Sequence, residues 1–235
     1  MGLIERKERE KEMRRRQIMD AGEMLFITNG FRNTTMDQIA NHCEIARGTV
    51  YLYFKNKFEL FVELIIRSLE SFIQNIRENL KAANTIEEKL SLVGRCYLDL
   101  YKKNRNGFML MNFHDTNGTE DTVPQDKIQY LLHKNQEVWD IIVEIIEEGK
   151  SKGVFRQDVK SSETAVLLWS ASNGIILTMD HMTNSHRPED LHCVDNQNSA
   201  AFMNTFVKMD YISILYQLWD TILNSIRTVI KNKIT

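Results

Sequence analysis

The chain has 235 residues, of which 43% are hydrophobic, so it is long enough to bury a sizeable core. Its three cysteines are odd in number and widely spaced, which argues against a disulfide framework and favours the reducing cytoplasm. Apolar runs end well short of a membrane span, the first residues are too charged for a secretory signal, and a net charge of −2 does not by itself indicate a nucleic-acid partner.

Helix-forming residues dominate the chain. Only two prolines and ten glycines interrupt it, while Leu, Ile, Met, Glu, Lys and Arg recur at helical spacing. No strand pattern or internal repeat is visible. The sequence therefore predicts an all-α fold.

The first predicted helix begins in a charged segment, residues 5–20, with seven basic and five acidic side chains. Apolar residues at a spacing of three and four then continue until Gly30, which is a natural stop for a helix. The charged segment is either a solvated extension of the helix, or Arg14–Arg16 also contact a phosphate backbone. The sequence leaves both interpretations open.

Two short helices are predicted next. Thr35 and Gln38 form a capping box, so one helix starts at about Met36 and can run only to about Cys43. A second brief helix, residues 47–53, has to fit before Asn56. Two such helices joined by a tight turn are the geometry of a helix-turn-helix, whose second helix enters the major groove of DNA.

The second short helix carries side chains that suit DNA. Arg47 can reach guanine edges or phosphate, and Gly48 lets the backbone approach closely. Lys57 stands at the start of the next helix, where its charge and the helix dipole both face an anion. The predicted DNA-binding residues are Thr35, Arg47, Gly48, Thr49, Tyr51, Tyr53 and Lys57.

Further amphipathic helices follow. Asn56 with Glu59 forms a capping box that opens a long helix to about residue 80, and Thr85 with Glu88 forms another. A Met- and Phe-rich segment over 108–113 and a polar break over 115–122 come next. Three more predicted segments are a helix from Pro124 to the Gly149–Gly153 region, a helix that starts at Ser162, and an apolar last helix over residues 209–230.

The head resembles that of a known family. The pairs Gly30-Phe31, Thr34-Thr35 and Ile39-Ala40, then the run Gly48 to Phe54 and Lys57, follow in the order and spacing of the DNA-binding head of the TetR repressors. Glu44 and Ala46 stand where family members usually carry a turn Gly and a capping Ser, which predicts either a slightly less stable head or a turn that starts differently. In the body, the pattern from Gly149 to Asp158 resembles the multidrug-regulator branch of the family.

The resemblance implies an architecture and a mode of action. It predicts a three-helix helix-turn-helix domain over residues 1–56 and a helical effector-binding and dimerisation domain over 57–235. Such a protein is a ligand-responsive repressor that binds a palindromic operator as a homodimer. The alternative is a structural or partner-recruiting protein of the same fold that binds DNA without a small-molecule effector.

Rings and thioethers gather in the predicted body, where they are either ordinary core at helical spacing or the lining of a ligand cavity. Few charges fall on these faces, so an effector of aromatic or acyl-chain type is predicted. The predicted effector-binding residues are Tyr97, Met111, Phe113, Trp139 and Trp169.

Small residues over 170–174 permit close approach of another helix, and the last helix has a strongly apolar stripe. Packing within one chain would explain both features. The family resemblance implies instead a four-helix dimer interface from two helices of each subunit. The predicted interface residues are Ala171, Gly174, Leu215, Trp219, Ile222 and Ile226.

One group of potential metal ligands stands out. His181, His186, His192 and Cys193 lie in or near a predicted loop, but their spacing matches no compact zinc pattern. We therefore expect no metal and no cofactor. The sequence also lacks G-x-S-x-G, P-loop and H-E-x-x-H motifs, which argues against an enzyme.

Overall fold

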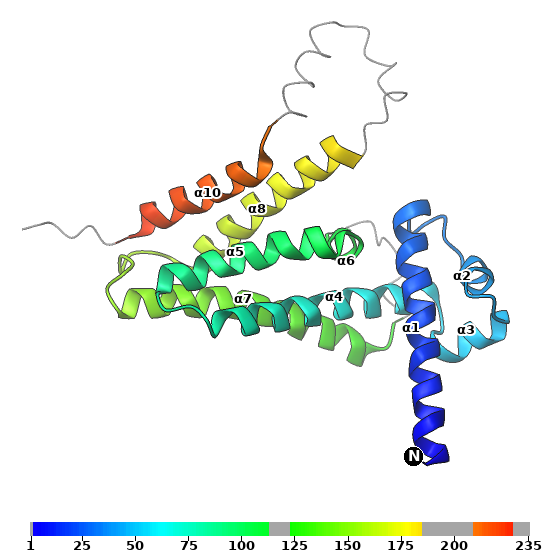
Figure 1. The fold of residues 1–235 in the computed structure, drawn as a ribbon. Coiled ribbons are helices and arrows are strands. Elements are labelled where there is room, and N and C mark those ends of the chain that lie inside the picture. Colours follow the sequence, from blue (N-terminus) through cyan, green and yellow to red (C-terminus); the bar gives the residue numbers. More distant parts are fainter. Residues whose placement is uncertain (1, 113–122, 185–208, 228–235) are drawn as a thin grey trace, which may run out of the picture. The chain divides into compact units, whose positions relative to one another are not determined.

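The computed structural model describes residues 2–112, 123–184 and 209–227, and in these ranges the chain is helical apart from one isolated bridge between Phe155 and Arg227 (Figure 1). The all-α prediction is confirmed. None of the described helices is long and apolar enough to cross a membrane. The helices are α1 (Leu3–Asn29), α2 (Met36–His42), α3 (Arg47–Tyr53), α4 (Lys57–Leu80), α5 (Ile86–Lys103), α6 (Arg105–Met111), α7 (Gln125–Ser151), α8 (Ser161–Asn184) and α10 (Tyr211–Ile226).

The chain forms two compact units. The first comprises Met1–Arg77 and Asp99–Val138, and the second comprises Glu78–Leu98 and Trp139–Thr235. Helices α4 and α7 each begin in the first unit and end in the second. The predicted domain boundary after residue 56 lies inside the first unit and stays a prediction.

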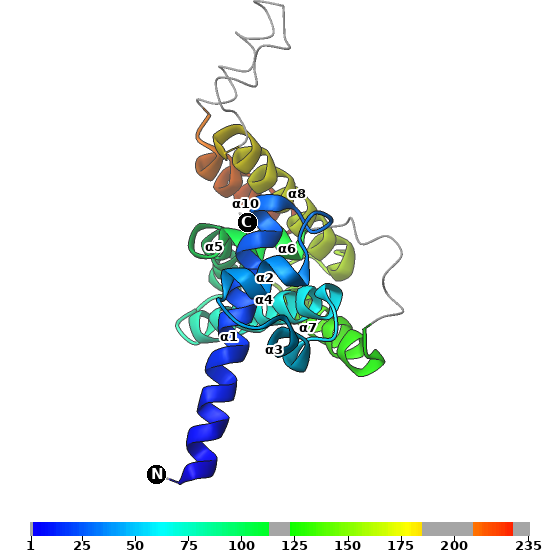
Figure 2. The same cartoon turned by 90° about the vertical axis from the view of Figure 1, so that its right-hand side faces the viewer.

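In the first unit, α1, α2 and α3 pack with the start of α4 around a shared core (Figure 2). Phenylalanine rings from different segments meet there: the centroid of Phe31 lies 5.2 Å from that of Phe26 and 4.9 Å from that of Phe61. Ile18, Ile39 and other apolar residues at helical spacing complete the core with essentially no exposed surface. Burial of each such side chain contributes about 1.5 to 3 kcal/mol, so the short helices α2 and α3 depend on this packing.

The turn between α2 and α3 has the two departures that the sequence indicates. Glu44 takes a left-handed backbone conformation, with φ at 54°. Ala46 occupies the N-cap of α3 and makes no side-chain capping hydrogen bond. By contrast, the predicted capping box of α2 is confirmed: Thr35 Oγ1 accepts from the Gln38 N–H at 3.2 Å, and Gln38 Oε1 accepts from the Thr35 N–H at 2.8 Å.

In the second unit, the apolar stripe of α10 packs within the chain. The Trp219 ring lies against Gly94 of α5, where an added Cβ would come within 2.6 Å of the ring. Its Nε1–H donates to Ser172 Oγ of α8 at 2.9 Å. Leu215, Ile222 and Ile226 are also buried in the single chain. This burial agrees with the alternative of packing within one chain, and the predicted place of these residues in a dimer interface stays a prediction.

The pattern from Gly149 to Asp158 has a packing explanation. Gly149 lies so close to the buried Phe155 ring that an added Cβ would come within 2.3 Å of it. Gly153 turns the chain between them with φ at +71°. These residues therefore close the end of α7 and lead the chain to α8.

Two substitutions in the turn between α2 and α3 should each make the protein more stable. Glu44→Gly removes the Cβ strain of the left-handed conformation, and Ala46→Ser supplies a cap, so each should raise the free energy of unfolding by up to about 1 kcal/mol. Urea unfolding followed by circular dichroism measures this change. Glu44→Ala is the control, because it retains the Cβ, and an equal gain in that variant would contradict the explanation.

Candidate nucleic-acid interface

Helix α3 presents most of its side chains to the outside. Only Val50 is fully buried, while Arg47, Gly48 and Tyr51 are exposed. The apolar side chain of Leu52 is 84% exposed. The predicted residues Thr49 and Tyr53 are half-buried on the flanks of this surface. The helix thus has one anchor in the core and a surface that is free to enter a groove.

Arg47 is held in place before any ligand is present. Its Nε lies 2.8 Å from Asp37 Oδ1 of α2, and its guanidinium carbon lies 5.5 Å from the centre of the Tyr51 ring. The Tyr51 hydroxyl and the Asp37 carboxylate raise the pKa of Arg47 further above its already high ordinary value. Arg47 therefore keeps its charge and presents a positioned fork of donors.

Gly48 lies in open space. An added Cβ at this position would meet no atom within 4 Å, so nothing inside the chain requires a glycine there. Glycine also weakens a helix relative to alanine by about 0.5 to 1 kcal/mol. A requirement from outside the chain, such as a closely approaching duplex, would explain the residue.

Lys57 has a structural task that the sequence did not reveal. Its ammonium donates to the backbone carbonyls of Phe31, Arg32 and Thr34 at 2.8 to 3.0 Å, and it lies 4.6 Å from the centre of the Phe31 ring. Burial lowers the pKa of Lys57. The ammonium thus ties the start of α4 to the turn between α1 and α2. The predicted contact of Lys57 with phosphate stays a prediction.

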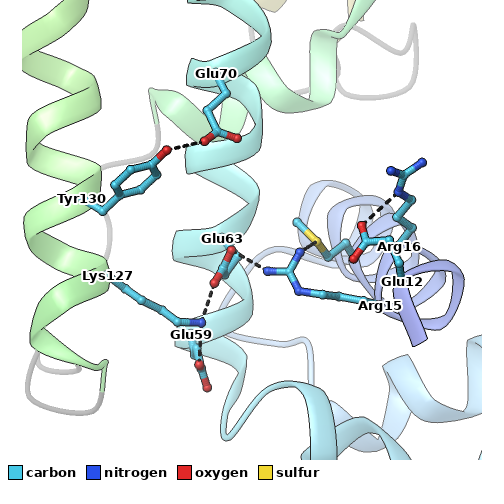
Figure 3. Close-up of polar contacts among 9 residues, drawn as sticks. Glu12, Arg15, Arg16, Glu59, Glu63, Glu70, Lys127 and Tyr130 are labelled. Carbon is cyan, nitrogen blue, oxygen red and sulfur yellow. Dashed lines mark hydrogen bonds and ion pairs between the residues drawn. The ribbon is translucent and has the colours of Figure 1, made fainter. Parts of the chain in front are cut away.

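A cluster of charged side chains joins α1, α4 and α7 (Figure 3). Lys127 on the first turn of α7 lies 2.8 Å from Glu59 and also pairs with Glu63, both on α4. Arg15 of α1 pairs with Glu63 at 2.7 Å from the other side and lies over the Phe54 ring that follows α3. Glu59 is almost fully buried and also accepts from the backbone N–H of Lys55 at 2.7 Å.

The pKa shifts in this cluster show that attraction outweighs burial. Burial alone would raise the pKa of Glu63, but the hydrogen bond from Lys127 and the charges of Arg15 and Lys127 bring it below its ordinary value of 4.5. Burial alone would lower the pKa of Lys127, and its hydrogen bonds to Glu59 and Glu63 raise it above 10.5. Glu63 and Lys127 are therefore both charged near neutral pH.

The predicted effector residues are brought together only in part. Trp139 and Trp169 form an edge-to-face pair with centroids 5.6 Å apart in the second unit. Tyr97 is buried in the same unit and donates its hydroxyl to Asn173 Oδ1 at 3.1 Å. Met111 ends α6 in the first unit, and Phe113 lies outside the described residues.

The candidate metal ligands fall mostly outside the described residues, which include His181 but not His186, His192 or Cys193. Within the described part of the chain, no group of three His, Cys, Asp or Glu side chains could hold a metal ion.

Two residues of the interface escaped the sequence reasoning. Asp37 pairs with Arg47 across two helices, and no local spacing indicates such a contact. Leu52 belongs to a helix of seven residues, which is too short to show which apolar position faces outward.

Two family models match the chain. The model "Bacterial regulatory proteins, tetR family" matches residues 18–64, which include the end of α1 from Ile18, all of α2 and α3, and the start of α4. The model "YsiA-like protein, C-terminal region" matches residues 65–182, about half of the chain.

Two curated relatives each match less than half of the chain. A fatty acid metabolism regulator protein of Bacillus subtilis is 35% identical over 85 residues, which are 36% of this chain and 44% of the relative. The transcriptional activator FasR of Mycolicibacterium smegmatis is 22% identical over 105 residues, which are 45% of this chain and 48% of the relative. The chain thus aligns with slightly less than half the length of these two relatives.

Solved structures share the fold over nearly the whole chain. The regulator FadR of Bacillus subtilis, in complex with stearoyl-CoA, has a TM-score of 0.67 and 20% identity, with 90% of this chain and 98% of that chain covered. The MbdR regulator of Azoarcus sp. CIB has a TM-score of 0.64 and 21% identity, with 91% and 98% covered.

The charged cluster predicts a stability loss that depends on pH. Lys127→Met leaves buried Glu59 without its cation and should lower the free energy of unfolding by about 1 to 3 kcal/mol at neutral pH. The variant also removes the hydrogen bond from Lys127 to Glu63. Folding lowers the pKa of Glu63, so this carboxylate stabilises the protein above about pH 4.5, and its contribution is lost as the pH falls through the lowered pKa. The difference from wild type should therefore shrink below about pH 4.5.

Urea unfolding from pH 3 to pH 8 measures this difference. Lys103→Met is the control, since it removes a mostly exposed lysine paired with Asp99 and should change the stability by less than about 0.5 kcal/mol. Equal losses in the two variants, or a Lys127→Met loss that is constant with pH, would contradict the role of the cluster.

Proposed function

The chain belongs to the TetR family of bacterial regulatory proteins, and from this premise we propose that it is a ligand-responsive repressor that binds a palindromic operator as a homodimer. The observation that carries the proposal is the surface of α3. Arg47 is positioned by Asp37 beside Gly48, which no contact within the chain requires. A positioned guanidinium and a backbone without a Cβ suit a helix that lies in the major groove.

The residues of the interface divide into two roles in this proposal. Arg47 reads base edges with its forked donors, while Thr35, Thr49, Tyr51 and Tyr53 contact the sugar-phosphate backbone. Gly48 permits the close approach. Lys57 stabilises the head through its hydrogen bonds to three backbone carbonyls. The dipole of α4 also favours a phosphate at the start of this helix.

We propose that the homodimer forms through the exposed face of α8, because the apolar stripe of α10 is buried within its own chain. Val166 and Leu167 are more than half exposed, and Gly174 on the same helix has open space around it. The half-buried Ala171 lies between them. An apolar surface with small residues suits close packing of two-fold related helices. We therefore propose that Ala171 and Gly174 lie in the interface. The buried residues of α10 hold this helix against its own chain: Leu215, Trp219, Ile222 and Ile226.

For the effector, we propose an acyl-CoA or a related long-chain acyl compound. The support is that one relative is a fatty acid metabolism regulator and that one solved structure of this fold holds stearoyl-CoA. In this chain, Tyr97, Trp139 and Trp169 supply rings in the second unit, which suits an apolar chain. Helices α4 and α7 each begin in the first unit and end in the second, so a displacement of either helix would reach the Lys127 cluster in the first unit.

If α3 binds DNA, replacing Gly48 should have opposite effects on stability and on DNA binding. Gly48→Ala should raise the free energy of unfolding by about 0.5 to 1 kcal/mol, because alanine favours the helix and has room. The same variant should bind a duplex selected by the wild type from a random pool more weakly. Arg47→Ala should weaken binding by about 1 to 3 kcal/mol and relax the sequence preference.

Fluorescence anisotropy with the selected and a scrambled duplex measures both effects. Lys160→Ala is the control, because it removes another exposed, ion-paired charge, which lies in the second unit. If Gly48→Ala and Arg47→Ala bind both duplexes as the wild type does, α3 is not the reading helix.

The proposed effector should stabilise the protein and release it from DNA. Stearoyl-CoA at 100 times its dissociation constant should raise the stability by about 2.7 kcal/mol, and coupling of ordinary size should lower DNA affinity by about 5- to 150-fold. Thermal unfolding, tryptophan quenching and anisotropy measure these changes, with free CoA as the control. Unchanged DNA affinity with every acyl compound would favour the alternative, a DNA-binding protein of this fold that has no small-molecule effector.

A further inference from the structure

The first half of α1 extends beyond the packed part of the head. The described side chains from residue 4 to residue 14 are all exposed, and the first fully buried ones are Ile18 and Met19. Both views show this part of the helix clear of α2 and α3 (Figures 1 and 2). We call residues 2–14 the arm.

Basic side chains of the arm form one row. Lys7, Lys11 and Arg14 are spaced by four and three residues, and the row continues with the buried residues Ile18 and Ala21. Residues at this spacing lie on one face of a helix. The basic row therefore lies on the side of α1 that packs against the head further along.

Acidic side chains lie on another face and neutralise other basic residues. Glu5, Glu8 and Glu12 form a separate row, which continues to Glu23, the partner of Arg67 on α4. Ion pairs neutralise Arg6 with Glu10 at 2.9 Å and Arg16 with Glu12 at 3.1 Å. By contrast, Lys7 and Lys11 form no ion pair with any residue in the described ranges, so their charges remain available to a partner outside the chain.

Hydrogen bonds fix the row next to the helix-turn-helix. Arg14 Nη1 donates to Gln17 Oε1 at 2.8 Å, and Gln17 Nε2 donates to the backbone carbonyl of Cys43 at 3.1 Å. Cys43 ends α2 directly before the turn to α3. Arg14 is close enough for its charge to offset part of the rise in the Cys43 pKa that burial causes. The row thus starts near the turn that precedes α3 and runs away from it along α1.

We propose that the row Lys7, Lys11 and Arg14 is a second DNA contact, which binds phosphates of the duplex beside the base pairs that α3 reads. The proposal rests on the proposed DNA binding by α3. We expect its partner to be the backbone and not the bases, because a separated row of cations matches a line of phosphates, and the ammonium groups of Lys7 and Lys11 are point charges without the forked donors of an arginine. Lys7 and Arg14 lie about 10 Å apart along the helix, a length of about three base pairs.

The test compares two triple variants of the full chain. Lys7→Gln with Lys11→Gln and Arg14→Gln removes the row, while Arg6→Gln with Arg9→Gln and Arg16→Gln removes the same charge from the other side of the same helix. The probe is the duplex that the wild type selects from a random pool, made with and without about five extra base pairs at each end, the reach of the arm. Anisotropy at 50 and 200 mM salt gives affinity and salt slope.

We expect the row variant to lose affinity for the long duplex, and for one arm this loss should be about 40-fold larger at 50 mM salt than at 200 mM salt. Its salt slope should be shallower by about 0.9 for each lost phosphate contact, roughly 2.7 for one arm and twice that for two arms. The other triple variant should bind nearly as the wild type does. Only the wild type and this control should gain affinity from the extra base pairs.

Equal losses in the two triple variants would overturn the proposal, since net charge alone would then explain them. Unchanged binding in both would overturn it as well, while leaving binding by α3 intact. If the wild type binds no duplex, the proposed function itself fails, and the arm loses its partner with it. The double variant Lys7→Gln with Lys11→Gln guards against a disturbed turn at Arg14, and it should retain about two thirds of the change in slope.

Discussion

The arrangement of the head depends on the partly buried charges on the first turns of α4 and on the partners that they find. Lys57 is directed back to three carbonyls of the turn after α1, while Glu59 and Glu63 face the cations of α1 and α7. An unpaired buried charge costs several kcal/mol, so these helices stabilise the head only in a relative position that satisfies every partner. The charges therefore act chiefly by fixing geometry, while the aromatic core supplies most of the favourable free energy.

The recognition helix itself has little local support. It has seven residues, an uncapped start at Ala46 and a strained residue two positions before that. An isolated helix of this length does not persist in water. Its order comes from Val50 in the core, from Phe54 beneath Arg15, and from the preceding turn, which Gln17 holds through the Cys43 carbonyl. A surface held by tertiary contacts can respond when those contacts change, which a locally stable helix would resist.

Local signals in the sequence were sufficient where the physics is local. The capping box of α2, the left-handed Glu44 and the missing cap at Ala46 depend on residues within four positions of one another, and the structure confirms them. The helical class follows from the spacing of apolar residues for the same reason. The stripe on α10 shows the limit, because its spacing identifies an apolar face but not what covers it. Gly94 on α5 leaves the space for Trp219, and that pairing exists only after the chain has folded.

The functional surface lies between these limits. Arg47 and Gly48 could be found from their places in a short helix, whereas Asp37 could not, since its contact depends on the crossing of α2 and α3. Lys57 shows that one position can favour two partners: the helix dipole attracts an anion to the start of α4, and the Lys57 ammonium donates to the carbonyls of Phe31 and Thr34. Because Arg15 and Lys127 share Glu63, a shift of α7 changes the partners available to α1 as well. The helix that carries the basic row and α7 thus share a single carboxylate as a partner, so under the proposed function contact with DNA and a movement of α7 would bias the same arrangement.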